Sequence, residues 1–180
     1  MSSLVQLDRD MFQIKNIKIS LKIKPIYLNS VLKHFDKERI AYKIKNNYII
    51  INNKFVYILF KPRDSIIKHI NVTKIPDIES ISNSLNLLKD TISYLIILSY
   101  KIDNITAVYD YKKEINQLKI LNNHKHLFNL KFNKEKFPGL FLKVLLGTFI
   151  IFHTGKVNLV GCKDPAHLFN LFEQLKKILE

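Results

Sequence analysis

FPGLFLKVLLGTFIIFHTGKVNLVGCK, residues 137–163, is the stretch that decides the fold this sequence predicts. It begins with a predicted Phe-Pro-Gly turn, alternates in apolar character up to a second turn at Thr154-Gly155, and returns over residues 156–161. Such alternation on both sides of a glycine turn is typical of a β-hairpin. Pro165 follows, and it begins a predicted helix with apolar residues at three- and four-residue spacing.

The same order of elements occurs earlier in the chain, which indicates an internal repeat. Asn16-Ile17 corresponds to Asn104-Ile105 at a spacing of 88, and Lys74-Ile75-Pro76 to Lys163-Asp164-Pro165 at a spacing of 89. Phe60 corresponds to Phe152 at a spacing of 92, with the difference assigned to the hairpin turn. We therefore expect an N-terminal lead-in over residues 1–13, a first repeat over 14–102 and a second over 103–180.

Each repeat is predicted to contain a strand, a helix, several antiparallel strands and a long helix. In the first strand, Ile17, Ile19, Leu21 and Ile23 alternate with Lys18, Ser20, Lys22 and Lys24, and Pro25 is expected to end it. The first repeat continues with a helix at 26–35, strands at 40–45, 48–52, 54–60 and 66–74, a turn at 61–64 and a helix at 76–92. The second has a strand at 105–112, a helix at 113–122 with Ile115, Leu118 and Leu121 on its apolar side, strands at 127–132, 140–146, 148–152 and 156–160, and the helix from Pro165. The predicted class is α+β, with both repeats in one curved antiparallel sheet whose convex side carries the helices.

The composition favours a polyanionic partner. A net charge of +14 and a pI of about 9.7 suit nucleic acid or an anionic membrane surface, with a basic but merely solvated surface as the alternative. The abundance of Ile, Asn and Lys is typical of an AT-rich coding genome, which inflates the lysine count. The apolar run at 94–100 is too short to span a bilayer, and the first twelve residues lack a signal-peptide pattern.

Nothing in the sequence predicts catalysis. His124 and His126 could present two imidazoles on one strand face, but no nearby acid or cysteine completes a metal set, and a loop or exposed strand pair is the alternative. Cys162 is the only cysteine, so a disulfide framework is excluded and a reducing compartment fits. No nucleophile–base set or glycine-rich phosphate loop is present. We expect no enzyme activity, no cofactor and no metal.

The sheet face opposite the helices is predicted to mix amides, lysines and bulky apolar residues. Period-two alternation places there Ile58, Phe60, His69, Asn71, Ile150, Phe152, Asn158 and Val160. Phe152 has the opposite parity to Phe149 and Ile151, so it is expected to point away from the core. A ring on such a face indicates a binding role, with a hairpin end or a dimer contact as the alternative.

Residues 137–163 resemble the second-repeat signature of the TATA-binding protein family, which is FPGL, an apolar strand and then IF-x-SGK-x-x-L-TGAK. Asn16-Ile17 and Asn104-Ile105 match the Gln-Asn-Ile-Val strands that open that family's repeats. The resemblance covers residues 14–180, most clearly the last 45. It implies a saddle that binds promoter DNA through the minor groove, bends it by inserting phenylalanines between base steps, and helps to recruit RNA polymerase.

The resemblance also implies roles for particular residues. The residues that would insert between bases are Phe137 and Phe152 in the second repeat and Phe60 with Ile40 in the first. The residues that would line the minor groove are Asn16, Asn104, Lys18, Thr106, His69, Asn71, Asn158 and Val160; amide donors suit the acceptors that A·T pairs display there. Lys74, Lys143, Lys156 and Lys163 would contact phosphates, and Glu135 stands in the acidic stirrup that docks transcription factor IIB.

Several positions depart from the family pattern. Ile40 replaces a phenylalanine, which predicts a stronger grip in the second repeat and a larger loss of affinity from mutating Phe152 than Ile40. Lys18, His69, Asn71 and Asn158 replace small apolar or threonine residues, and such a polar lining tolerates a guanine amino group, which puts a strict TATA preference in doubt. This divergence suggests a protist or large DNA virus homologue, acting in the nucleus or, if viral, in the host cytoplasm, the viral factory and the virion.

Two functions from different classes follow. The first is a promoter factor that bends AT-rich or less specific duplex DNA and recruits a transcription factor IIB-like factor and RNA polymerase. The second is a scaffold in a transcription complex that keeps the fold but binds DNA weakly or not at all. No membrane partner is expected.

Overall fold

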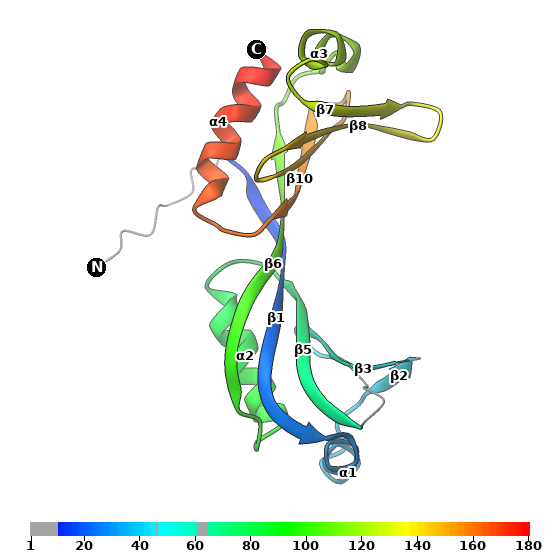
Figure 1. Ribbon diagram of the computed structural model, residues 1–180, viewed down its shortest axis with the longest axis vertical. Coiled ribbons are helices and arrows are strands. Elements are labelled where there is room, and N and C mark those ends of the chain that lie inside the picture. Colours follow the sequence, from blue (N-terminus) through cyan, green and yellow to red (C-terminus); the bar gives the residue numbers. More distant parts are fainter. Residues whose placement is uncertain (1–10, 46, 61–64) are drawn as a thin grey trace, which may run out of the picture. The chain divides into compact units, whose positions relative to one another are not determined.

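The computed structural model describes residues 11–45, 47–60 and 65–180, and within them the chain forms ten strands and four helices (Figure 1). Hydrogen bonds connect the strands in the order β2-β3-β4-β5-β1-β6-β10-β9-β8-β7, a single open antiparallel sheet, so the predicted α+β class is confirmed. Two compact units share this chain: unit 1 includes residues 104–180 and the segment up to Lys15, and unit 2 is Asn16–Asp103. Most of the predicted lead-in, residues 1–10, and the predicted turn at 61–64 lie outside the described residues.

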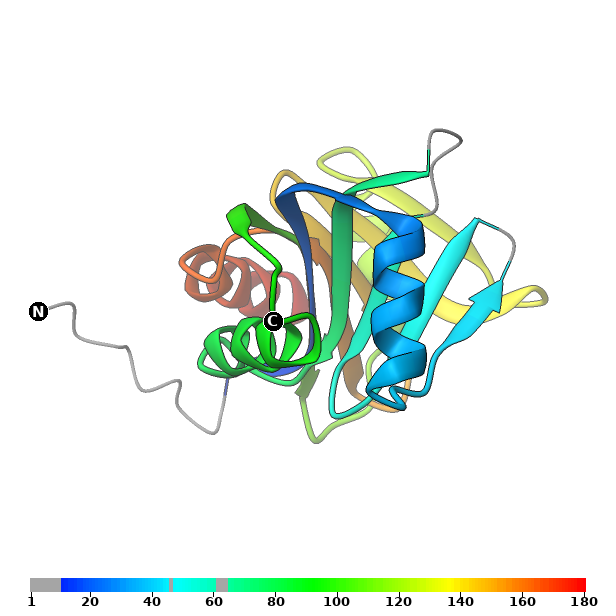
Figure 2. The same cartoon turned by 90° about the horizontal axis from the view of Figure 1, so that it is seen from below.

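Unit 2 contains most of β1 (Gln13–Tyr27), α1 (Leu28–Lys37), β2 (Lys43–Lys45), β3 (Tyr48–Asn52), β4 (Val56–Phe60), β5 (Ile66–Ile75), α2 (Ser80–Thr91) and the first part of β6 (Ile97–Asp110). The alternation in β1 is confirmed, since Ile17, Ile19, Leu21 and Ile23 are at most 2% exposed. Helix α2 covers this buried side, and the Tyr57 hydroxyl of β4 donates to the carbonyl oxygen of Ser84 in α2. Helix α1, visible with α2 in Figure 2, is tied to it by a hydrogen bond of 3.0 Å between His34 Nε2 and Thr91 O.

The sequence predicted that Pro25 ends the first strand, and this prediction was wrong. Strand β1 continues to Tyr27, and α1 begins at Leu28. The pairing of β1 with β5 shifts register between Lys22 and Ile26, which marks a bulge or irregularity at the proline. A residue without an N–H group is tolerated at such a position because the ladder is interrupted there in any case.

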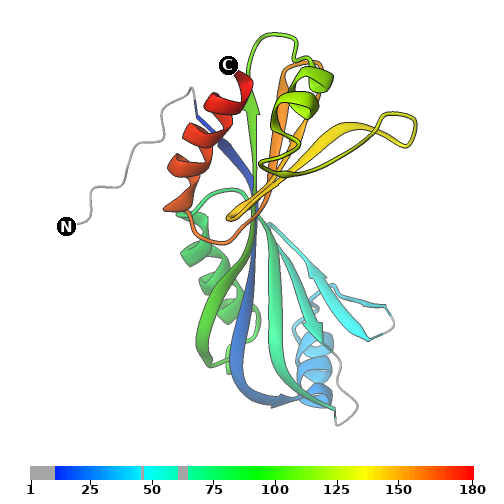
Figure 3. The same cartoon turned by 45° about the horizontal axis from the view of Figure 1, so that its top comes forward.

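Unit 1 contains the rest of β6, α3 (Gln117–His124), β7 (Asn129–Asn133), β8 (Phe137–Val144), β9 (Gly147–Ile151), β10 (Lys156–Cys162) and α4 (His167–Leu179). The predicted hairpin is confirmed, with Phe149 opposite Leu159. Its turn contains Gly155 at φ +90°, where an added Cβ would overlap the carbonyl oxygen of Lys113. Helix α4 lies beside β6 (Figure 3), where the rings of Tyr109 and Phe172 are 5.0 Å apart between centroids.

Two predictions about unit 1 were wrong. Residues 137–139 do not form a turn: Phe137 begins β8 opposite Asn133, and the turn lies just before it, where the Lys136 N–H donates to the Asn133 carbonyl oxygen. Pro138 is accommodated at the start of the strand, where its missing N–H matters least.

The helix predicted from residue 113 begins at Gln117 instead. The Ile115 N–H donates to the His153 carbonyl oxygen, which keeps that segment out of the helix, and the Asn116 side chain caps the helix by accepting from the Lys119 N–H. The buried residues are consequently Gln117 and Ile120, whereas Leu118 is 60% exposed.

Candidate nucleic-acid interface

In each unit, every second residue of the central strands points away from the buried core, and we call this side the open face. In unit 2 it carries Lys18, Ser20, Lys22, Ile58, Phe60, His69 and Asn71; in unit 1 it carries Thr106, Val108, Asp110, Ile150, Phe152, Asn158 and Val160. All of these residues are half-buried or exposed, while most of their strand neighbours of opposite parity are buried; Lys68, Tyr109 and Gly161 are the exceptions. The alternation predicted for these strands therefore holds.

Asn16 and Asn104 make the same backbone contact in the two units. The Asn16 Oδ1 accepts from the Lys74 N–H at 2.8 Å, and the Asn104 Oδ1 accepts from the Gly161 N–H at 2.6 Å. Lys74 and Gly161 both adopt left-handed backbone conformations, at φ +62° and +83°. Because each amide oxygen is engaged, each amide is oriented with its NH₂ group as the remaining donor, and one hydrogen of Asn104 reaches the Thr106 hydroxyl.

This contact corrects the register of the repeat in its late strands. Lys74 corresponds to Gly161, a spacing of 87, and not to Lys163 as predicted. The strand pairs agree, since Ile75 lies opposite Ile17 and Cys162 lies opposite Ile105. The Lys-x-Pro motif had aligned the loops that enter the long helices, and those loops differ in length between the units: Pro76 follows Lys74 by two residues, whereas Pro165 follows Gly161 by four.

The four lysines predicted to contact phosphates are all exposed, but they lie in different surroundings. Lys143 and Lys163 line one hollow of about 470 Å³ beside the β8–β9 turn. Lys156 lies opposite Asp110 in the β10–β6 pair. A 2.8 Å hydrogen bond from Lys112 holds the pKa of Asp110 below its usual value, and Lys156 contributes in the same direction.

Each unit carries a pair of aromatic rings on its open face. Phe137 of β8 and Phe152, which follows β9, lie edge to face with ring centroids 5.8 Å apart. In unit 2 the ring against Phe60 is Tyr48, at 5.2 Å. Phe60, Phe137 and Tyr48 are each 37–39% exposed, although large apolar rings are usually buried.

Tyr48 was missed by the sequence reasoning, which had paired Phe60 with Ile40. Ile40 lies in the loop after α1, where its N–H donates to Phe35 and its side chain lines a cavity with residues of α1, β3 and the end of α2. Tyr48 precedes Phe137 by 89 residues, the average spacing of the repeat, and this was the signal that could have identified it.

The side chain of Gln117 is hydrogen-bonded to the backbone beside both rings of the aromatic pair in unit 1. Its side chain is 7% exposed, and its Nε2 donates to the carbonyl oxygens of Pro138 at 2.8 Å and Ile151 at 2.7 Å. Pro138 adjoins Phe137, and Ile151 adjoins Phe152. One buried amide therefore fixes the separation of the two backbone segments that carry the rings.

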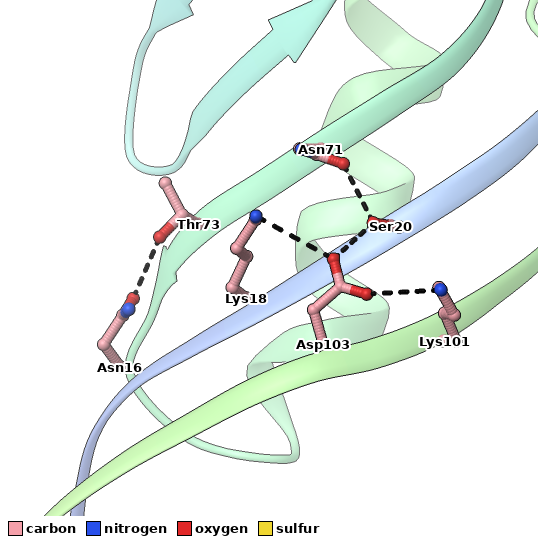
Figure 4. A network of polar contacts seen from close by, with 7 residues as sticks. All are labelled: Asn16, Lys18, Ser20, Asn71, Thr73, Lys101 and Asp103. Carbon is pink, nitrogen blue, oxygen red and sulfur yellow. Dashed lines mark hydrogen bonds and ion pairs between the residues drawn. The ribbon is translucent and has the colours of Figure 1, made fainter. Parts of the chain in front are cut away.

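A polar network occupies the open face of unit 2 (Figure 4). The Ser20 hydroxyl contacts the Asp103 carboxylate and also lies 2.9 Å from the side-chain amide of Asn71. Lys18 and Lys101 place their ammonium groups 4.0 and 3.7 Å from the same carboxylate. Asp103 was not predicted here, because Ile105 and Ala107 are buried and their parity assigns residue 103 to the buried side. The alternation of β6 changes between Asp103 and Asn104.

The remaining candidates occupy simpler positions. His69 lies opposite Lys22 in the β5–β1 pair, and Glu135 is exposed in the turn between β7 and β8. Cys162 is fully buried, with its Sγ 3.2 Å from the Asp164 carbonyl oxygen, and burial raises the pKa of its thiol. Among the residues that the structure describes, no group of three His, Cys, Asp or Glu side chains could hold a metal ion, and no helix is long and apolar enough to cross a membrane.

Three comparisons relate this chain to known proteins. Residues 99–180 match the family model "Transcription factor TFIID (or TATA-binding protein, TBP)". Over 84 residues, 46% of the chain, it is 34% identical to mouse TATA box-binding protein-like 2 and 32% identical to the TATA-box-binding protein of Pyrobaculum neutrophilum. These matches span only 24% and 41% of the length of the two relatives.

The whole fold matches a solved structure. Methanococcus jannaschii TBP superimposes with a TM-score of 0.74 over 94% of this chain and 98% of the archaeal one, at 18% sequence identity. The family-model match covers the second repeat, and the structural match extends the likeness of fold over the first. Residues 99–180 therefore match the TATA-binding protein family in sequence, and the chain as a whole has the fold of an archaeal member of that family.

Proposed function

We propose that this protein is a transcription initiation factor that binds duplex DNA through the minor groove and bends it. The observation that carries the proposal is the recurrence, in both units, of two aromatic rings in mutual contact on the open face: Phe137 with the half-buried Phe152, and Tyr48 with Phe60. Apolar side chains that insert between base steps unstack them, and the cost of a few kcal/mol per step is offset by the contacts that the bent duplex permits.

The oriented amides support the same proposal. A·T pairs present only acceptors in the minor groove, and the NH₂ groups of Asn16 and Asn104 are donors whose direction is set by the backbone contacts of their oxygens. The exposed lysines Lys74, Lys143, Lys156 and Lys163 suit phosphates, so affinity should fall as salt rises. The family consists of non-enzymatic DNA-binding factors, in agreement with the expectation of no catalytic activity.

The proposal also includes protein partners and a cellular compartment. Recruitment of RNA polymerase, together with docking of a transcription factor IIB-like protein near Glu135, is what a promoter factor of this family would add to DNA binding. Glu135 is exposed and therefore accessible to a partner. We propose the nucleus as the site of action. The relatives named above come from a mouse and an archaeon, so a viral factory or virion gains no support from them.

A gel-shift titration tests the proposal. The full chain is titrated onto AT-rich and GC-rich duplexes over a salt series, alongside a Phe137→Ala plus Phe152→Ala variant. We expect salt-dependent binding by the natural chain and a large loss in the variant. Phe169→Ala is the matched control, since Phe169 is an aromatic residue on α4 that is 55% exposed. Absence of binding at low salt, or binding that the double substitution leaves unchanged, would refute the proposal.

A scaffold role is the second candidate, and one observation favours it. Ile96, Leu98 and Tyr100 recur at every second residue in and just before β6, and each is 50–56% exposed. Exposed apolar side chains in such a row are typical of a protein-interaction surface. A chain that fails the gel shift but still binds a transcription factor IIB-like protein would favour this second function.

A further inference from the structure

Asp103 places a negative charge on a surface that is proposed to face DNA, which is itself negatively charged. Its surroundings explain how the two can lie close together. It belongs to β6, and its contacts Ser20 and Lys18 belong to the neighbouring strand β1. Its side chain is 22% exposed, so it remains accessible from the open face of unit 2. Lys18 and Lys101 both approach it within 4.0 Å, so its negative charge is locally outweighed. The carboxylate can therefore lie near DNA without a net repulsive field.

The hydrogen bonds around Ser20 determine which groups remain free to bind. A hydroxyl has one proton, and of its two neighbours the Asp103 carboxylate is the stronger acceptor, so the proton goes there. The atom of Asn71 that lies 2.9 Å from Ser20 Oγ is the amide oxygen, Oδ1; because the hydroxyl proton is engaged with Asp103, turning this amide over would place Nδ2 there as a donor to Ser20 Oγ. In that orientation Asn71 would keep its Oδ1 as a free acceptor. The Asp103 carboxylate is an acceptor in either orientation of the Asn71 amide, and the turned amide would add a second acceptor to the same network.

The minor groove distinguishes base pairs by a single donor. A·T pairs present the acceptors adenine N3 and thymine O2, whereas a G·C pair adds the amino group on guanine C2. Acceptors facing acceptors are unfavourable, and the guanine amino group is the complementary donor. We propose that the Asp103 carboxylate accepts a hydrogen bond from a guanine 2-amino group in the minor groove, so that unit 2 prefers a G·C pair. This inference rests on the proposed function.

The corresponding position in unit 1 lacks this chemistry. Asn71 lies opposite Ser20 in the β5–β1 pair, and its counterpart Asn158 lies opposite Val108 in the β10–β6 pair. Val108 has no proton to donate, and no carboxylate is found in a polar contact with Asn158 among the described residues. The preference for a guanine amino group should therefore occur once in the binding site, on the side that unit 2 contacts.

Base analogues distinguish the effect of the guanine 2-amino group on binding from the effect of the rest of the base pair. The full chain is titrated onto A·T duplexes in which one pair at a time is replaced by G·C, by inosine·C, which lacks the 2-amino group, or by 2,6-diaminopurine·T, which carries it on an A·T-like pair. At one or two positions we expect the two amino-bearing pairs to bind about tenfold tighter than inosine·C, as suits a hydrogen bond to a charged group. Asp103→Ala should remove this difference.

Two further variants complete the test. Glu173→Ala changes the net charge equally on α4, where Glu173 pairs with Lys176 at 2.6 Å, and it should keep the full preference. Asp103→Asn retains one acceptor oxygen without the charge and should show a smaller preference; it decides the outcome if circular dichroism shows that Asp103→Ala is unfolded. Equal binding of G·C and inosine·C, or a preference that Asp103 variants retain in full, would overturn the inference and leave the proposed function intact. A natural chain that binds no duplex would overturn both.

Discussion

The two units share their backbone contacts and differ on their open faces. In both, an asparagine accepts from a left-handed residue and two aromatic rings lie together. Yet the positions of Lys18, Ser20 and Thr73 in unit 2 are occupied in unit 1 by Thr106, Val108 and Val160. Residues that set the strand geometry have been kept, whereas residues facing outward have diverged. Unit 1 therefore presents the more apolar surface and unit 2 the more polar one.

This difference predicts that the two aromatic pairs contribute unequally to the affinity for duplex DNA. A phenylalanine that inserts between bases loses little by leaving water, but Tyr48 must also desolvate its hydroxyl. Replacing Phe137 and Phe152 by alanine should weaken duplex binding about 100-fold, while replacing Tyr48 and Phe60 should weaken it about tenfold, since a base-step contact is worth a few kcal/mol. Gel-shift titrations at one salt concentration measure both.

Single substitutions sharpen the same comparison. Tyr48→Phe should strengthen binding because it removes the hydroxyl, and Ile40→Ala should change affinity less than Phe152→Ala because Ile40 lines a cavity beside the helices. A larger loss from the Tyr48 and Phe60 pair than from the phenylalanine pair would reverse the assigned asymmetry.

The support beneath the phenylalanine pair predicts the next largest effect. Gln117→Leu keeps the side-chain volume but leaves the carbonyl oxygens of Pro138 and Ile151 without their donor. Unfolding free energy should fall by about 2 kcal/mol, the cost of buried polar groups left unsatisfied, as measured by urea denaturation. Gln117→Glu is the matched variant, since it keeps the shape and removes both donated hydrogens. A leucine variant as stable as the natural chain would show that these bonds do not hold the strands.

The sequence was sufficient where alternation and repeat spacing acted together. Ile17 to Ile23 gave the buried side of β1, and the hairpin with its following helix gave the frame of unit 1. Prediction failed where a tertiary contact overrode a local signal. Pro25 lies at a register shift that no local pattern reveals, and the start of α3 depends on a bond from Ile115 to His153.

The candidate site was predicted only in part. Parity correctly placed Phe60 and Phe152 on the open faces, and the family resemblance indicated Phe137, which is exposed. Asp103 could not be found this way, because the alternation of β6 changes beside it, and a parity count carried across that point assigns it to the wrong side. Tyr48 was available from the repeat spacing, but the faint resemblance of the first repeat directed attention to Ile40.

Each unit has a buried aromatic residue at the same position of the repeat, and the two residues differ by one hydroxyl group. Tyr57 in unit 2 corresponds to Phe149 in unit 1, and Tyr57 donates to the Ser84 carbonyl oxygen at 2.9 Å while burial raises its pKa to about 12. Tyr57→Phe should lower the unfolding free energy by about 1.5 kcal/mol because that oxygen loses its donor. Calorimetry measures this loss. An unchanged melting temperature would show that the hydroxyl does not help to hold α2 against the sheet.

The smallest effect concerns the left-handed residue that each asparagine contacts. A Cβ at Gly161 would find its nearest atom 4.0 Å away, so Gly161→Lys adds backbone strain without a collision and should cost about 1 kcal/mol. The reverse change, Lys74→Gly, relieves similar strain but gives the unfolded chain more freedom, so the two effects should nearly cancel. Gly161→Asn is the control, because asparagine tolerates this conformation better than lysine. Urea denaturation should rank the unit 1 variants as glycine, asparagine and lysine in falling stability. Equal stability of the asparagine and lysine variants would mean that the asparagine contact alone, rather than the glycine, sets the left-handed turn, and the two units would then be equivalent at this point.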